Sequence, residues 1–309
     1  MQYKLTNLSK NDGKDIYDML QEFPADENGF INSVYGKSYE EYNEWLIRHE
    51  IMQTKKPDKE VLFFIVYAFT IPLICICLMQ YIPAFSQGCV RFILYGIEGA
   101  SPSIAAIITI LQKYGINGTR CFILDKYKNG FNIKLCIMGF LIPVAMLTVG
   151  KLLTYVTPYH NQFIILLSLK KIIIVTWALV AEELGWRGYL QDKIEKKFGK
   201  KLTPLIIGSI WSAWHYHFFL SGTMEVPIVV FTCGCIAESY GYYIITKLGK
   251  GNIVPASLWH FSGNLFFNLY LLNPNWNNGS IISYLIVNTL YVLYIGAFIY
   301  CRKKDKKEN

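Results

Sequence analysis

The sequence has few of the features that identify a soluble enzyme. Charged residues occupy only 17% of the 309 positions, and no H-E-x-x-H zinc motif occurs. The cysteines lack the spacing of a metal or disulfide framework: Cys75/Cys77 and Cys233/Cys235 are C-x-C pairs in apolar stretches, where cysteine usually acts as a small apolar residue. No cleavable signal peptide is found, because the first apolar run begins near residue 61.

Apolar residues dominate the rest of the chain. They make up 53% of it, and the mean hydropathy is +0.28, which is more than one soluble core needs. A helix needs about 20 apolar residues to cross a bilayer. We therefore expect an all-α, polytopic membrane helix bundle with about eight spans. The candidate spans are residues 61–80, 92–112, 132–154, 171–190, 203–221, 225–246, 254–272 and 281–301.

The basic residues predict the orientation of this bundle, since loops rich in Lys and Arg stay in the cytoplasm. Alternate loops hold residues 113–131, the run at 192–201, residues 247–253 and the tail after 301, while Arg91 and Lys151 are almost alone on the other side. We expect a multi-pass protein of the cell membrane with both termini in the cytoplasm. Attraction to the lipid bilayer and this bias explain the net charge of +8, so no nucleic-acid partner is predicted.

Residues 1–55 differ from residues 56–309, the expected membrane domain, because they are polar and patterned for short soluble helices. The stretch "SYEEYNEWL" contains a capping box from Ser38 to Glu41. The longer run "DIYDMLQEFPADENGFINSVYGKSYEEYNEWL" resembles the opening of a GNAT-type acetyltransferase. No glycine-rich acetyl-CoA loop follows it, so acetyl transfer is not expected. We interpret the segment as a stub or a cytosolic docking element, with no cofactor.

Ionisable residues stand inside three of the predicted spans, where an unpaired charge is costly. In "EELGWR", Glu183 and Arg187 are four apart and are expected to form an ion pair on one helix face. Glu182 points about 100° away and is left for chemistry. The alternative is that both glutamates share Arg187 in a purely structural network.

Histidines supply the other two clusters. His215 and His217 of "WHYHFF" point to opposite sides of a helix, so one is expected to face the bundle and the other not. His260 and Asn264 are four apart and share a face, although polar side chains also hold membrane helices together. All three clusters are expected roughly 10–18 Å below the cytoplasmic surface, at about 1.5 Å per residue. They predict a water-filled cavity within the membrane.

The motifs E-E-x-x-x-R ("EELGWR"), W-x-x-x-H ("WSAWH") and H-x-x-x-N ("HFSGN"), in this order on successive spans, resemble the CAAX protease and bacteriocin-processing family of membrane endopeptidases. The resemblance extends over about residues 60–301, with Trp211 where the family has Phe or Trp. It implies a glutamate-dependent endopeptidase in which Glu182 and His215 activate water. It further implies that Arg187 and Glu183 balance charge, and that His260 and Asn264 stabilise the oxyanion.

Two other readings stay open. A glutamate and two histidines could hold zinc with an open position for water, although the resemblance favours a metal-free site. A non-catalytic immunity protein or scaffold could also keep the same fold, but it would have no need of these costly groups. Expected partners are the lipid bilayer and a peptide or membrane-protein substrate. Peptide maturation, bacteriocin immunity and membrane-protein processing are the candidate roles.

Overall fold

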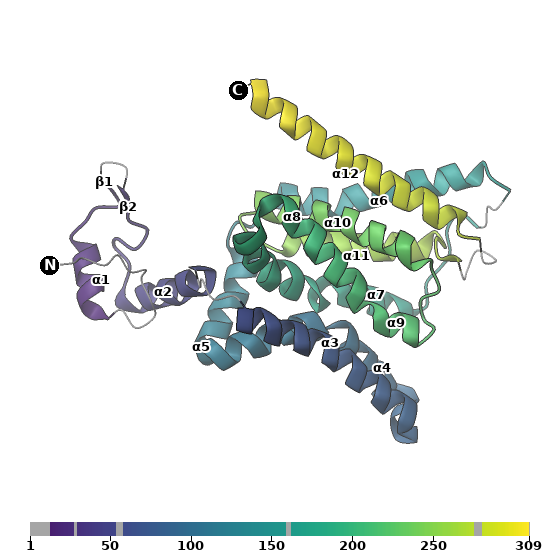
Figure 1. Cartoon of the computed structure of the whole chain (residues 1–309), viewed down its shortest axis with the longest axis horizontal. Helices are drawn as coiled ribbons and strands as arrows, with labels where there is room; N and C mark the ends of the chain where they lie inside the picture. Colours follow the sequence, from purple (N-terminus) through teal and green to yellow (C-terminus); the bar gives the residue numbers. More distant parts are fainter. Residues whose placement is uncertain (1–12, 28–29, 54–57, 159–161, 275–279, 309) are drawn as a thin grey trace.

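The computed structural model describes residues 13–27, 30–53, 58–158, 162–274 and 280–308, and these form an all-α membrane helix bundle with a small segment at one end (Figure 1). The prediction of an all-α membrane bundle is confirmed. One hairpin, with two strands of two residues each, is the only β-structure in the described ranges.

The N-terminal segment contains α1 (Lys14–Gln21), β1 (Asp26–Glu27), β2 (Phe30–Ile31) and α2 (Tyr39–Gln53). The predicted capping box opens α2: the backbone N–H of Glu41 donates to Ser38 Oγ at 3.2 Å, and that of Ser38 donates to Glu41 Oε2 at 2.7 Å. Leu20, Tyr42 and Leu46 belong to a small apolar core of their own. This core holds the two short helices together beside the bundle.

The bundle itself follows the predicted apolar stretches, each of which coincides with one helix or a pair of helices. These elements are α3 (Asp58–Tyr81), η1 (Pro83–Phe85), α4 (Gly88–Gly99), α5 (Ser101–Lys128), α6 (Ile133–Tyr155), α7 (Leu169–Ala181), η2 (Leu184–Leu190), α8 (Gln191–Trp214), α9 (Tyr216–Leu220), α10 (Ile228–Leu248), α11 (Val254–Leu269) and α12 (Ile282–Glu308). Local signals set several starts. The side chain of Asn132 caps α6, and that of Ser168 caps α7.

Several of these helices are interrupted. Within the described residues, three helices are long and apolar enough to cross a membrane, namely 59–81, 133–155 and 228–248. The pair α4 and α5, bent by 66°, makes a fourth when counted as one span. Gly115 and Gly199 have positive φ angles of 66° and 76°, which favour glycine, and they break α5 and α8 inside the loops predicted at 113–131 and 192–201. The three or four candidate spans among the described residues are fewer than the eight that the apolar pattern predicts.

Close backbone approaches fix the helices that carry the candidate site. α11 packs against α6 and α7, and α10 packs against α8 and α12 (Figure 1). A Cβ on Gly139 would lie 2.2 Å from the carbonyl oxygen of Pro255, and one on Gly185 would lie 2.4 Å from that of Pro102. Only glycine allows these contacts, which join α6 to α11 and η2 to α5.

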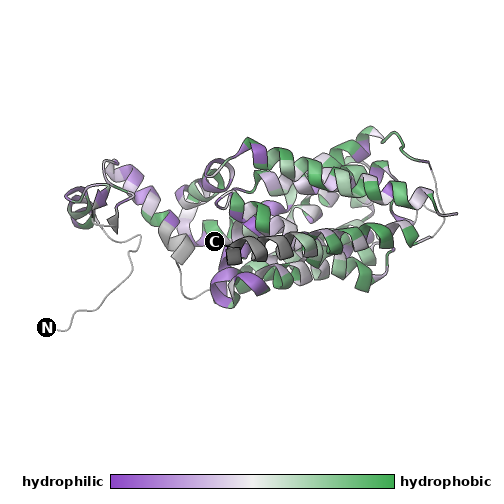
Figure 2. Cartoon of the chain, turned by 90° about the horizontal axis from the view of Figure 1, so that it is seen from above, coloured by the Kyte–Doolittle hydropathy of each residue, from purple (hydrophilic) through white to green (hydrophobic). Residues whose placement is uncertain are grey.

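The two ends of the bundle differ in polarity (Figure 2). We call the end with loops 129–132 and 249–253 the basic end; the N-terminal segment and the C-terminal end of α12 both lie there (Figures 1 and 2). Lysines at this end are paired: Lys193 binds Glu60 at 2.7 Å and Lys126 binds Asp192 at 3.0 Å. The opposite, far end carries residues 82–87, 162–168, 221–227 and 270–274.

One basic residue lies elsewhere than expected. Lys151, counted above with an outer loop, is buried within α6, and its Nζ donates to the backbone carbonyl of Tyr270 at 2.8 Å. It thus acts as an internal link between helices rather than as a loop charge.

Candidate active site

The paired glutamates lie where a helix changes its winding. α7 ends at Ala181, Glu182 adopts a turn with φ −120° and ψ −39°, and η2 continues as a π-helix. Such wider turns occur often at functional sites. The sequence analysis assumed a regular helix across both glutamates, and this assumption is wrong because the winding changes at Glu182. The two side chains still point in different directions, since Glu182 lines the cavity and Glu183 does not.

Glu183 and Arg187 form the expected ion pair, at 3.2 Å between Arg187 Nη1 and Glu183 Oε1. Both side chains are almost fully buried. The second guanidinium nitrogen, Nη2, donates to Ser239 Oγ at 3.1 Å, and the guanidinium lies 4.1 Å from the ring centre of Tyr242. An arginine on an aromatic face is well suited to burial, since the guanidinium is weakly hydrated.

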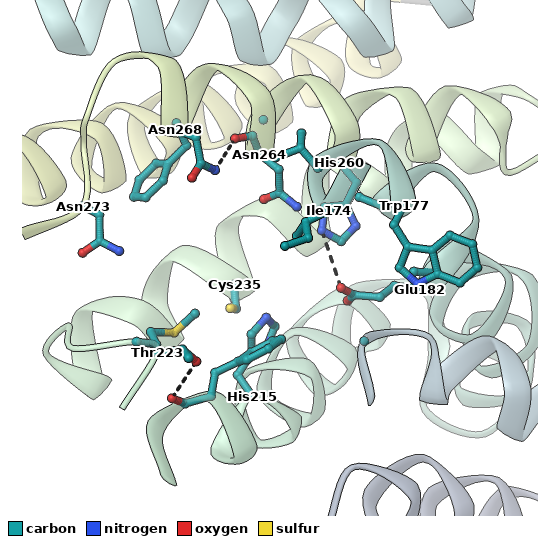
Figure 3. A pocket seen from close by; sticks show the side chains of 18 of the residues that line it. Ile174, Trp177, Glu182, His215, Thr223, Cys235, His260, Asn264, Asn268 and Asn273 are labelled. Atoms are coloured by element: carbon teal, nitrogen blue, oxygen red, sulfur yellow. Dashed lines mark hydrogen bonds and ion pairs between the residues drawn. The ribbon is translucent and has the colours of Figure 1, made fainter. Parts of the chain in front are cut away.

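His260 connects the two glutamates. Its Nδ1 lies 2.9 Å from Oε1 of Glu183, and its Nε2 lies 3.7 Å from Oε1 of Glu182. Glu182 Oε2 in turn accepts a hydrogen bond of 2.7 Å from Trp211 Nε1. Figure 3 shows the Glu182 carboxylate and the His260 ring facing each other across one side of a cavity. The sequence did not predict this bridge, because it depends on how α11 packs against α7.

The two histidines of α8 and α9 are both buried, so the prediction that only one faces the interior is wrong. His215 lines the cavity, and its Nδ1 lies 2.7 Å from the backbone carbonyl of Trp211. His217 instead pairs through Nδ1 with Oε1 of Glu98, a buried residue of α4. The bend between α8 and α9 makes room for both rings, since the helix is not continuous there.

Asn264 lies one turn after His260 on α11 and lines the same cavity (Figure 3). Its side chain is exposed to that cavity, and no hydrogen bond to its amide group is found within the described ranges. The amide is therefore accessible to a ligand.

The cavity has a volume of about 690 Å³, within the range of sites that hold small ligands. Glu182, His215, His260 and Asn264 line it, as do residues 223–224 and Asn273 near the far end. The cavity was expected on the side of the N-terminal segment, and this prediction is wrong. Residue depth along a helix gives no information about which side is open, which depends on the packing of α4, α7 and the 221–227 loop.

The cavity is also lined by a carboxylate that the three motifs did not indicate. Glu238 projects from α10 and accepts a hydrogen bond of 3.2 Å from the hydroxyl of Tyr242. It stands in "GCIAESYGYY", an otherwise apolar run, so the rule applied to the other three clusters would have identified it. The same holds for Glu98, a single charge in "LYGIEGA".

The residues do not form an evident zinc site. Within the ranges that the structure describes, no group of three or more His, Cys, Asp or Glu side chains has the arrangement of metal ligands. We therefore derive no step through a metal.

A carboxylate and two imidazoles thus lie around one cavity in a helical membrane bundle, an arrangement that is suited to acid–base chemistry. Residues 162–266, about a third of the chain, match the family model described as type II CAAX prenyl endopeptidase Rce1-like. The match includes all six candidate site residues and confirms the resemblance to the CAAX protease and bacteriocin-processing family. It supports a CAAX-type membrane endopeptidase. A comparison with curated proteins found no match.

Proposed function

We propose that the chain is an intramembrane endopeptidase that hydrolyses a peptide or membrane-protein substrate without a covalent intermediate. The observation that carries the proposal is the convergence of Glu182, His215 and His260 from three separate helices on one cavity. Each of these groups is costly to bury in an apolar bundle, and a shared reaction accounts for all three.

Hydrogen bonds support roles for two of the groups as bases. The backbone carbonyl of Trp211 can only accept, so Nδ1 of His215 carries the proton and Nε2 keeps a lone pair. Glu182 has one oxygen held by Trp211 and the other near His260. A water between Glu182 and His215 would lose its proton to this pair as its oxygen attacks the scissile carbonyl carbon. The proton then passes to the leaving amine.

The oxyanion that forms in this attack needs donors. Nδ1 of His260 donates to Glu183, which leaves Nε2 facing Glu182 and the cavity. In the imidazolium form this nitrogen donates to the oxyanion, and the amide of Asn264 supplies a second donor. Glu183 and Arg187 would act as positioning residues, because Glu183 holds the His260 ring while Arg187 balances its charge.

The membrane setting extends the proposal. If the basic loops face the cytoplasm, both termini are cytoplasmic and the cavity opens toward the outer face of the cell membrane. Substrates would then reach the site from outside or from the lipid bilayer. Peptide maturation, immunity and membrane-protein processing are all compatible with such access.

The variant Glu182→Gln tests this function, because an amide keeps the size of the side chain but cannot act as a base. We expect it to lose peptide turnover in purified form while it keeps its thermal unfolding midpoint. Membrane peptidomics of cells with the wild type and the variant should reveal the missing products. Glu40→Gln, at an exposed position of α2 away from the cavity, is the matched control. Identical peptide profiles and turnover would favour a non-catalytic scaffold.

A further inference from the structure

Glu238 is a cavity carboxylate to which the proposed reaction gives no role. It projects from the middle of α10 into the same cavity as Glu182 and His260. Among the described residues, its one hydrogen bond comes from the Tyr242 hydroxyl at 3.2 Å, and no cationic side chain lies within ion-pair distance of it. A carboxylate offers about four acceptor positions, so most of its capacity is unfilled.

The nearby Arg187 guanidinium forms no ion pair with Glu238 among the described residues. The guanidinium of Arg187 is bound to Glu183 and Ser239, and the Tyr242 ring covers it at 4.1 Å. Arg187 itself is only 1% exposed and does not line the cavity. Glu182, in contrast, has His260 and Trp211 as partners.

The walls around Glu238 make an unpaired carboxylate expensive. Gly234 and Cys235 precede it on α10, and Phe231 and Tyr291 also line the cavity. An ionised group among such apolar neighbours is stable only when it is paired or hydrated. Without a partner the carboxyl would stay protonated, so a partner for the ionised form must come from the contents of the cavity.

We propose that Glu238 forms a subsite that binds a cationic group of the substrate, an ammonium or guanidinium. This inference rests on the proposed function, since it names a feature of the peptide that the site would cleave. The cation could come from a Lys or Arg side chain or from a free peptide amino terminus, and both present the same hydrogen-bond donors to a carboxylate. The competing explanation is that Glu238 only orients Tyr242 over Arg187.

Paired peptides test the subsite. Internally quenched peptides would carry lysine or its neutral isostere norleucine at each position in turn, with acetylated or free amino termini. For wild-type protein in proteoliposomes we expect lysine at one position, or the free terminus, to raise kcat/KM about tenfold. Comparison of the acetylated and free series identifies which of the two sources supplies the cation.

Two variants separate the explanations. In Glu238→Gln the amide keeps the size and accepts from Tyr242, and we expect the preference ratio to fall to about one because the charge is gone. Tyr242→Phe removes the hydrogen bond but leaves a ring over Arg187, and it should keep the ratio. Glu40→Gln, at an exposed position of α2 away from the cavity, should also keep it. A ratio that persists in Glu238→Gln, or that Tyr242→Phe abolishes, would overturn the subsite.

Binding measurements keep this inference separate from the proposed reaction. The same peptides would be titrated against Glu182→Gln protein, with and without Glu238→Gln. Tighter binding of cationic peptides that depends on Glu238 supports the subsite even if wild-type protein cleaves nothing, an outcome that would count against the protease alone. Cleavage together with equal binding of lysine and norleucine peptides would count against the subsite alone.

Discussion

Trp211 donates its indole N–H to Oε2 of Glu182 across 2.7 Å, and this bond joins α8 to the turn after α7. It fixes one carboxylate oxygen while the other stays near His260 and the cavity. Since Trp211 also contacts His215 through its backbone carbonyl, one residue orients both proposed bases.

Trp211→Phe should therefore slow the reaction without unfolding the protein. The phenyl ring fills most of the same space, but the hydrogen bond to Glu182 is lost. A hydrogen bond to a charged group contributes about 1.5–3 kcal/mol, so kcat should fall about tenfold or more. Steady-state kinetics on a cleaved peptide would measure this, with the unfolding midpoint as control. An unchanged kcat would show that Trp211 does not orient the base.

Glu183→Gln should act mainly on stability. Glu183 is fully buried, and its carboxylate pairs with both Arg187 and His260. The variant therefore leaves a buried guanidinium without its counter-ion. Breaking a buried pair in this way costs about 3–5 kcal/mol. We expect lower yield and a lower unfolding midpoint in detergent, measured beside Glu182→Gln. If Glu183→Gln abolished turnover at full stability while Glu182→Gln kept it, the roles of the two glutamates would be reversed.

Chelation tests the metal-free reading. In the proposed mechanism Glu182, His215 and His260 act through proton transfer and hydrogen bonding, so dialysis against a chelator should leave turnover intact. Elemental analysis of the active protein should find less than one zinc per chain. Stoichiometric zinc that leaves together with activity, and restores it on return, would decide for a zinc-dependent protease.

The sequence predicted the elements of this fold better than their continuity. Apolar stretches near 20 residues long mark the bundle helices, because burial in lipid requires that length. The break at Gly199 lies in the loop predicted at 192–201, whereas the break after Ala181 was not predicted, since a π-turn leaves no hydropathy signal. Five of the six candidate site residues were selected because ionisable side chains in apolar runs are rare, and Asn264 was added because it shares a helix face with His260.

What the sequence could not provide is the relation between helices. The bridge from His260 to both glutamates depends on how α11 packs beside α7. The position of α11 is in turn fixed by its close contact with α6, where Gly139 meets Pro255. The direction of the cavity likewise depends on tertiary packing. Glu238 is a different case. Its isolated charge can be read from the sequence, but it was not selected because it belongs to none of the three motifs.

Deletion of residues 1–50 should leave turnover unchanged. The segment contacts the bundle at α5, where Arg48 lies 4.0 Å from Asp125 and Ile47 lies near Gly118. These contacts are at the basic end, whereas the lining of the cavity extends from the middle of the bundle to the far end. Peptide turnover and membrane insertion of the truncated protein would be compared with those of the full chain. Acetyl-CoA binding by the full chain that this deletion abolishes would contradict a non-catalytic segment.

The charge of Asp192 is expected to make the stability of the basic end depend on pH. Burial disfavours its ionised form, but the ammonium groups of Lys126, Lys247 and Lys196 outweigh this and lower the pKa of Asp192. A carboxyl whose pKa is lower in the folded state contributes stability above its unfolded pKa of about 3.9, and loses it as pH falls through the folded value. Lys126 Nζ, 3.0 Å away, supplies most of this effect.

Asp192→Asn should therefore be less stable than wild type at pH 7 by about 1 kcal/mol, because the carboxylate is partly solvated. The difference should disappear below about pH 4, where the wild-type carboxyl also becomes neutral. Thermal unfolding of both proteins in detergent between pH 7 and pH 3 measures this difference, with Glu225→Gln as the control. A gap that stays constant with pH would show that Asp192 stabilises the basic end by packing rather than by charge.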